Sequence, residues 1–285
     1  MARGFDTRYR HKRGSRQWAL GHFWTTVTWI IALVLFFPVV WMVVTAFKPE
    51  GKAQTYPPTF VFNPTLSEFS KAFSEGIGGP LGHSLFVSLV SLVFVLTLGI
   101  PAAYALSIRA VKRWRDVLFF FLATKMLPYV AALVPIYLVV LHLGLLDNDW
   151  SLVILYTGFN LPIAVWMIRS FLLEIPKEML EAARIDGAGV WTEITRVILP
   201  IVAPGIAATA LICVIFSWNE FFFANFLTTI NGKTVPAFLS GLQQSEGLYY
   251  ASLAAGATLA SLPVILAGWI AQKQLVRGLS LGALK

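Results

Sequence analysis

Charged residues and cysteine are both scarce in this chain. Only 13% of its 285 residues are charged, 57% are hydrophobic, and the mean hydropathy is +0.72. A soluble protein of this length would need more charged residues to cover its surface. The single cysteine, Cys213, lies in an apolar run and excludes an intramolecular disulfide framework. The composition therefore predicts an integral membrane protein.

Several catalytic and nucleotide-binding motifs are also missing. The sequence has no Gly-x-x-x-x-Gly-Lys-Ser/Thr loop, so the chain is not expected to hydrolyse ATP. The four histidines are scattered singly, which predicts no metal site. His-Glu-x-x-His, Gly-x-Ser-x-Gly and paired intramembrane aspartates are absent, which argues against a membrane enzyme.

Six apolar runs are long enough to cross a bilayer as helices, which need about 20 residues each. Backbone polar groups in lipid must be satisfied within helices or closed barrels, and the alternation of barrel strands is absent. The first run is too long for a signal peptide and no cleavage site follows it. We therefore predict an all-α bundle of six spans. The runs cover about residues 22–47, 84–108, 117–143, 151–169, 201–228 and 251–272.

The basic residues indicate one orientation. With six spans, 17 of the 22 lysines and arginines fall on the same side of the membrane. The positive-inside rule makes that side cytoplasmic and places both termini there. The net charge of +8 is then explained by topology, and no nucleic-acid partner is expected. Residues 1–20 form a basic cytoplasmic tail, and residues 21–285 form one transmembrane domain with a core at about 84–276. The proline-rich segment 48–80 is expected to lie along the outer surface.

A polar loop with two glycines separates the fourth and fifth spans. Pro176 suits the first turn of a helix that runs to Arg184, and Gly187 supplies the freedom needed for a turn. A second amphipathic helix follows, and Leu199-Pro200 leads into the fifth span. Its apolar face is predicted from Trp191, Ile194, Val197 and Ile198. The pattern predicts a helix-turn-helix on the membrane surface, and an amphipathic hairpin without a partner is the alternative.

This loop resembles the "EAA" loop of bacterial ABC importer permeases. Those proteins carry Glu-Ala-Ala, three residues, Gly, nine residues, Ile, one residue and Leu-Pro. Val197 replaces the isoleucine, and the other positions match. The matching residues are Glu181, Ala182, Ala183, Gly187, Leu199 and Pro200.

The resemblance implies a type I importer permease in the bacterial inner membrane. Loop 174–200 would then be the coupling loop that binds the ATPase, with Glu181 pairing with a basic residue there and Asp186 preceding the turn. The tail 274–285, with Arg277, would reach into the ATPase dimer. The implied partners are that ATPase dimer, which would bind the ATP and Mg, a second permease subunit and an external solute-binding protein. No cofactor is expected in this chain.

The similarity covers about residues 20–285 and includes the segments 124–128, 134–137, 143–147 and 217–220. The chain looks like the maltose-permease group and, within it, most like the sorbitol and mannitol branch. This implies import of a sugar alcohol or a related small carbohydrate. A different sugar or an oligosaccharide is the alternative, and a stand-alone secondary transporter or channel is a more distant one.

Two charged residues, Lys125 and Glu220, lie inside apolar spans. A charge at mid-bilayer costs about 3 kcal/mol on insertion scales, so it usually faces a cavity or the bundle interior. A polyol would need such dispersed donors and acceptors, together with aromatic faces for its carbon backbone. Alternatively, the two charges satisfy each other or the carbonyls of a helix break near Pro128. The remaining candidates for the substrate pathway are Tyr129, Tyr156, Asn160, Trp218, Asn219 and Asn225.

Overall fold

A computed structural model describes residues 15–109, 111–242 and 249–282, with the backbone alone for 15–20 and 273–282. Within these ranges every regular element is a helix, as the composition predicts. Five helical stretches are long and apolar enough to cross a membrane. They are built from α1 (Ser15–Ala46), α4 (Gly78–Ser107), α7 (Asp149–Leu172), α10 (Leu199–Trp218) and α13 (Tyr250–Gly282).

The third predicted span is not one helix. It consists of α5 (Trp114–Lys125) and α6 (Tyr129–His142), which meet at an angle of 92°. Pro128 precedes α6 in an extended conformation, with φ −62° and ψ 125°. Proline disfavours the helical conformation of the residue before it, so α5 ends and a new helix starts. The predicted span over 117–143 is therefore interrupted at residues 126–128, next to Pro128, where a helix break is one of the alternatives indicated by the sequence.

The other prolines inside predicted spans interrupt no helix. Pro101, Pro135, Pro162 and Pro204 each lie within a continuous helix.

The fifth span starts earlier and ends earlier than predicted. Helical structure runs without a gap from α9 (Val190–Thr192) through a π-helical turn, η1 (Glu193–Ile198), into α10. Leu199-Pro200 does not separate the elements, because Pro200 occupies the first turn of α10, where its missing N–H is tolerated. The helix then stops at Trp218, and a short α11 (Phe222–Leu227) follows.

The segment between α1 and α4 is tied to the beginning of α13. It contains α2 (Glu50–Ala53) and α3 (Ser67–Ser74). The Glu50 carboxylate accepts the N–H of Ala251 at 3.1 Å, and the hydroxyl of Ser252 donates to Glu68 at 2.6 Å. The remaining short helices are α8 (Lys177–Ile185) and α12 (Val235–Leu242).

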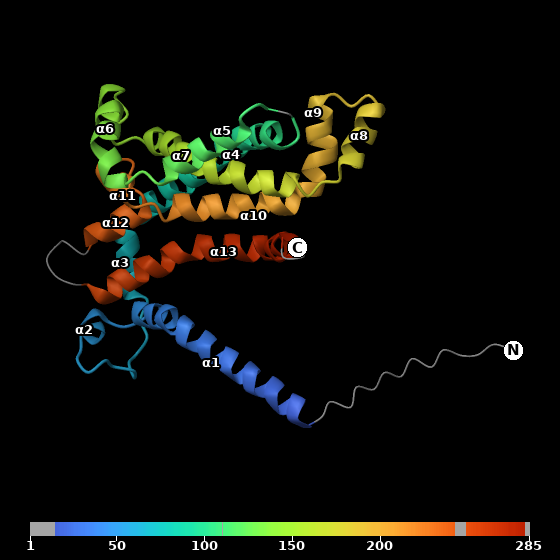
Figure 1. The fold of residues 1–285 in the computed structure, drawn as a ribbon. Helices are drawn as coiled ribbons and strands as arrows, with labels where there is room; N and C mark the ends of the chain where they lie inside the picture. Colours follow the sequence, from blue (N-terminus) through green and yellow to red (C-terminus); the bar gives the residue numbers. More distant parts are fainter. Residues whose placement is uncertain (1–14, 110, 243–248, 283–285) are drawn as a thin grey trace.

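The long helices form the bundle seen in Figure 1, in which α4 packs along α7 and α10 lies between α7 and α13. The start of α1 and the end of α13 lie at the end of the bundle where α8 projects. Two chain ends at the same end of the bundle fit an even number of membrane crossings. That this end is the cytoplasmic one stays a prediction. The apolar part of α1 has no buried residue in its most hydrophobic stretch, so its surface is available to lipid or another subunit.

Candidate translocation cavity and coupling hairpin

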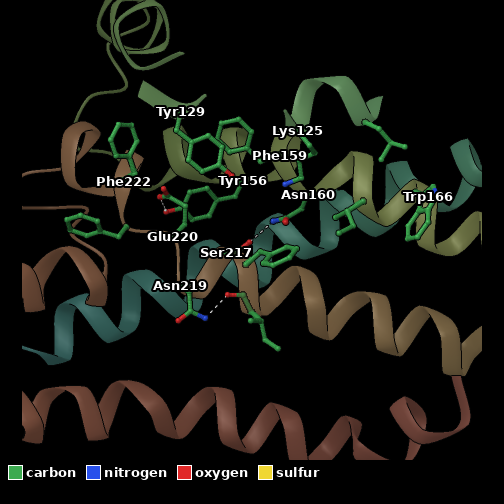
Figure 2. Close-up of a pocket in the computed structure, with 15 residues that line it drawn as sticks. Lys125, Tyr129, Tyr156, Phe159, Asn160, Trp166, Ser217, Asn219, Glu220 and Phe222 are labelled. Carbon is green, nitrogen blue, oxygen red and sulfur yellow. Dashed lines mark hydrogen bonds between the residues drawn. The ribbon is translucent and has the colours of Figure 1, made fainter. Parts of the chain in front are cut away.

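A cavity of about 1000 Å³ lies between α5, α6, α7, α10 and α11, at the breaks in the two interrupted spans. Figure 2 shows polar and aromatic side chains from these helices pointing into one space. Six of the eight residues predicted for the substrate pathway line it. They are Lys125, Tyr129, Tyr156, Asn160, Asn219 and Glu220.

The other two predicted residues, Trp218 and Asn225, lie outside the cavity lining. The indole Nε1 of Trp218 donates to the carbonyl oxygen of Ala260 at 3.1 Å, so this side chain packs against α13. Asn225 is exposed on α11. Each helical residue is rotated by about 100° from the one before it, so a neighbour of Ser217 need not share its face.

Sequence reasoning missed several apolar lining residues on α7. Phe159, Ile163 and Trp166 line the cavity together with Tyr156 and Asn160. These positions recur every three or four residues, which is the spacing of one helix face. Extending the predicted pair Tyr156 and Asn160 along that face would have identified them.

Aromatic rings form one wall of the cavity, as Figure 2 shows. Tyr129 is stacked on Phe159 with ring centroids 5.4 Å apart. The buried Phe223, which does not line the cavity, packs against both rings, 5.4 Å from Tyr129 and 5.1 Å from Phe159. Phe222 lies next to this group, 6.4 Å from Tyr129. Such faces suit the apolar C–H surface of a carbohydrate.

Glu220 is held by three donors. The Tyr156 hydroxyl donates to it at 2.7 Å, and the backbone N–H groups of Phe223 and Ala224 donate at 2.9 and 3.1 Å. The carboxylate thus satisfies the first turn of α11 after the break in the span. No ion pair joins it to Lys125 in the part of the chain that the structure describes. The Lys125 ammonium instead lies 5.6 Å from the ring centre of Phe216.

The amide groups in the cavity are anchored at one end. Asn160 Nδ2 donates to the Ser217 hydroxyl at 2.9 Å, which joins α7 to α10 at the level of the break. Asn219 Nδ2 donates to the carbonyl oxygen of Ile215 at 2.8 Å. The two interactions fix the orientation of each amide relative to the cavity.

The polar loop forms the predicted helical hairpin, here called the coupling hairpin (α8 to η1, residues 177–198). Gly187 makes the turn with φ +82°, a conformation that glycine adopts without strain. Glu181 and Ala182 are exposed on α8, Ala183 is half-buried, and Asp186 ends the helix.

The predicted apolar face of the second arm of the coupling hairpin is only partly buried against the bundle. Ile194 and Ile198 are buried against the bundle, as expected, and Val197 is half-buried. Trp191, which belongs to the same predicted apolar face, is 71% exposed and is not buried against the bundle. Leu199 is half-buried and Pro200 exposed at the start of α10.

Some predicted residues lie outside the described parts. Arg277 falls in the portion of α13 whose side chains are not described, and residues 1–14 and 283–285 lie outside the described residues.

These features define a class of protein. An apolar helical bundle with a polar and aromatic cavity and a helical hairpin projecting from one end is the architecture of a membrane permease. Residues 95–281 match the family model described as "Binding-protein-dependent transport system inner membrane component", and the chain belongs to this family.

Individual relatives agree over nearly the whole length. The chain is 37% identical to the "Probable ABC transporter permease protein y4oR" of Sinorhizobium fredii, over 92% of this chain and 95% of the relative. It is 30% identical to the trehalose/maltose transport system permease MalG of Thermococcus litoralis, over 90% and 94% of the two chains. A chain of the bacterial ABC transporter involved in the import of alginate shares the fold, with a TM-score of 0.72 at 22% identity, covering 91% and 98%.

The protein is thus an integral inner-membrane permease of the carbohydrate-type ABC importers. It is not itself an enzyme, since ATP hydrolysis in these systems belongs to a partner ATPase.

Proposed function

We propose that this chain lines the translocation pathway of an ATP-driven importer for a sugar alcohol or a related small carbohydrate. The observation that carries the proposal is the cavity, about 1000 Å³ in volume, with aromatic rings on one side and Lys125, Asn160 and Asn219 on the others. Dispersed donors and acceptors replace water around hydroxyl groups, and ring faces cover the C–H surface.

The names of the relatives support a carbohydrate cargo. The Thermococcus litoralis relative is a trehalose/maltose permease, and an Agrobacterium fabrum relative, 30% identical over 87% of this chain, belongs to a sulfoquinovosyl glycerol transport system. These cargoes differ in size and charge, so the relatives support a carbohydrate cargo in general. Sorbitol or mannitol is our more specific proposal. A different sugar or an oligosaccharide is the second candidate, and the volume of the cavity accommodates it.

The surface of the coupling hairpin supports ATPase binding. Ile185, one helical turn after the exposed Glu181 on α8, is 86% exposed, and Trp191 on α9 is 71% exposed. Large apolar side chains exposed on a structured loop mark a protein interface. We expect the ATPase dimer, which holds the ATP and Mg, to cover them, with a second permease completing the pathway and a solute-binding protein delivering the cargo.

The cargo is tested with the importer reconstituted in proteoliposomes with its ATPase and solute-binding protein. We expect binding-protein-dependent uptake of radiolabelled sorbitol or mannitol that requires internal ATP. Uptake of maltose or trehalose in place of the polyols would select the second candidate. Uptake without the ATPase would support the stand-alone transporter and contradict the proposal.

The cavity is tested with Tyr129→Ala, which removes the central ring of the aromatic wall. Aromatic contacts contribute about 0.5–1.5 kcal/mol, so we expect uptake at low cargo concentration to fall about 2–13-fold. Tyr137→Ala on the same helix is the matched control, because Tyr137 does not line the cavity. Equal uptake by both variants would contradict a contact between Tyr129 and the cargo.

A further inference from the structure

Glu193 is a fully buried carboxylate in the coupling hairpin, with a side-chain exposure of 0%. It is the first residue of the π-helical turn η1. Removing a charge from water costs several kcal/mol unless it is paired and hydrogen-bonded. Turns of this kind are rare and often occur at functional sites. The partners of this carboxylate therefore indicate what it does.

The first partner comes from the other arm of the hairpin. Arg184 on α8 donates through Nη2 to Glu193 Oε1 at 2.9 Å and through Nε to Oε2 at 3.0 Å. This two-point geometry is the strongest form of a guanidinium–carboxylate contact. The hydrogen bond to the Glu193 carboxylate raises the pKa of Arg184, so the guanidinium is charged at neutral pH. The pair closes the hairpin across Gly187.

The second partner belongs to a membrane-spanning helix. The hydroxyl of Tyr104, near the end of α4, donates to Glu193 Oε1 at 3.2 Å. The same hydroxyl accepts from Nε of Arg109 at 3.0 Å. Tyr104 is itself buried, and its ring packs in the same apolar cluster as Leu180 and Ile194 of the hairpin. Both arms of the hairpin are thereby attached to α4.

The contact between Glu193 and Tyr104 gives the hairpin a second connection to the helical bundle. The hairpin is already joined to α10 through the chain, because η1 runs into α10 without a break. The contact with α4 gives a second connection, and α4 packs along α7, which carries Tyr156 and Asn160 into the cavity. If the hairpin moves as one body, a displacement of α8 would reach α10 directly and α7 through α4, and both of these helices line the cavity.

We propose that Glu193 is a positioning residue that holds α8, η1 and α4 together, so that movement imposed on α8 is transmitted to the cavity. This inference rests on the proposed function, since it assumes that an ATPase moves α8. It assigns to Tyr104, Arg109, Arg184 and Glu193 a role in the coupling of ATP hydrolysis to transport that differs from the binding of the ATPase.

The test uses the complete reconstituted importer and measures cargo uptake per ATP hydrolysed. Tyr104→Phe keeps the buried ring and removes only the hydroxyl, while Glu193→Gln keeps the shape and removes the charge. We expect both variants to co-purify with the ATPase and to hydrolyse ATP at near wild-type rates. Uptake per ATP should fall about fivefold or more, because Tyr104→Phe removes a hydrogen bond to the Glu193 carboxylate and Glu193→Gln removes the charge that pairs with Arg184. Arg184→Lys, which keeps the charge without the two-point contact, should be intermediate.

Two controls separate this inference from the proposed function. Arg196→Gln alters an exposed charge on the same hairpin and should leave uptake per ATP unchanged. Glu181→Ala should weaken co-purification with the ATPase, and if it does not, the assignment of the hairpin as the ATPase-binding element fails. If Glu181→Ala does weaken binding while Tyr104→Phe and Glu193→Gln keep the wild-type ratio, only the coupling role of Glu193 is refuted. The coupling role is also refuted if uptake, ATPase activity and the amount of folded protein all fall by the same factor in these variants. That result would indicate a purely structural residue.

Discussion

The loop between α11 and α12 is anchored by one carboxylate from a distant turn. Asp147, between α6 and α7, has a left-handed backbone with φ +56° and directs its side chain at successive backbone N–H groups. The Asn231 side chain adds a further donor at 3.0 Å. The backbone donors are Thr229, Ile230, Asn231 and Gly232, at 2.7 to 3.3 Å. Such a row of N–H groups forms a concave site for an anion.

The strength of this anchor follows from its pKa. Partial burial by itself would raise the pKa of Asp147, but the backbone N–H donors outweigh it and lower the pKa from 3.8 to about 2. One pH unit corresponds to about 1.4 kcal/mol, and the site is partly exposed, so we take about 1–2 kcal/mol as its contribution. Asp147→Asn removes the charge and places an amide among donors, so we expect the loop to open about 5–30-fold more often.

Hydrogen exchange of the amides of residues 229–232 in the purified protein measures this opening. The amides should exchange about 5–30-fold faster in Asp147→Asn than in the wild type. Because the folded pKa lies below the ordinary value, the stabilisation is complete above pH 3.8 and is lost as the pH falls toward 2. After correction for chemical exchange rates, opening in the wild type should therefore stay constant from pH 7 to about 5 and rise below about 4. The variant should show a smaller rise.

Asp116→Asn, which alters an exposed aspartate in the first turn of α5, serves as the control and should leave the amides of this loop unchanged. Equal exchange in the wild type and Asp147→Asn would refute the reasoning, as would an undiminished rise at low pH in the variant.

Two further predictions concern glycines. A Cβ at Gly205 would lie 2.4 Å from the ring of Phe171, so Gly205→Ala should force α7 and α10 apart and cost about 1–3 kcal/mol in thermal unfolding. Gly158→Ala, which meets no atom within 4 Å, should not, and equal stability of the two variants would contradict the packing argument. Gly187→Ala should cost about 1–2 kcal/mol through its φ of +82° and lower the yield of complex with the ATPase, whereas Gly189→Ala, with φ −71°, should not.

The sequence predicts the approximate positions of the five long apolar helices and of the bent pair α5 and α6, because hydropathy is averaged over a whole helix. Interruptions of a span are harder to predict, because an interruption depends on which backbone hydrogen bonds are lost at single positions. The break before Pro128 has a recognisable signal in its proline. The break after Trp218 lies in a run with polar residues, Asn219 and Glu220, and the Glu220 contacts to α11 appear only in three dimensions.

The candidate site is also predicted only in part. Polar and charged residues in apolar spans identify most of the cavity, because their cost in lipid forces them inward. The rule fails for Trp218, whose indole N–H finds a carbonyl on α13 instead. The cluster around Glu193 could not be found from the sequence, because Tyr104 is 89 residues away from it and no spacing rule joins them.

The two functional regions lie at opposite ends of one helix. The stretch from Val190 to Trp218 comprises 29 residues, or about 40 Å at 1.5 Å per residue. Glu193 lies in its first turns, and Ser217, which accepts from Asn160 at the cavity, lies at its end. Helix ends fray unless they are held by further contacts. The buried ion pair holds the end at the coupling hairpin, and the hydrogen bond to Asn160 holds the end at the cavity. Weakening either contact should therefore impair transport more than it impairs folding.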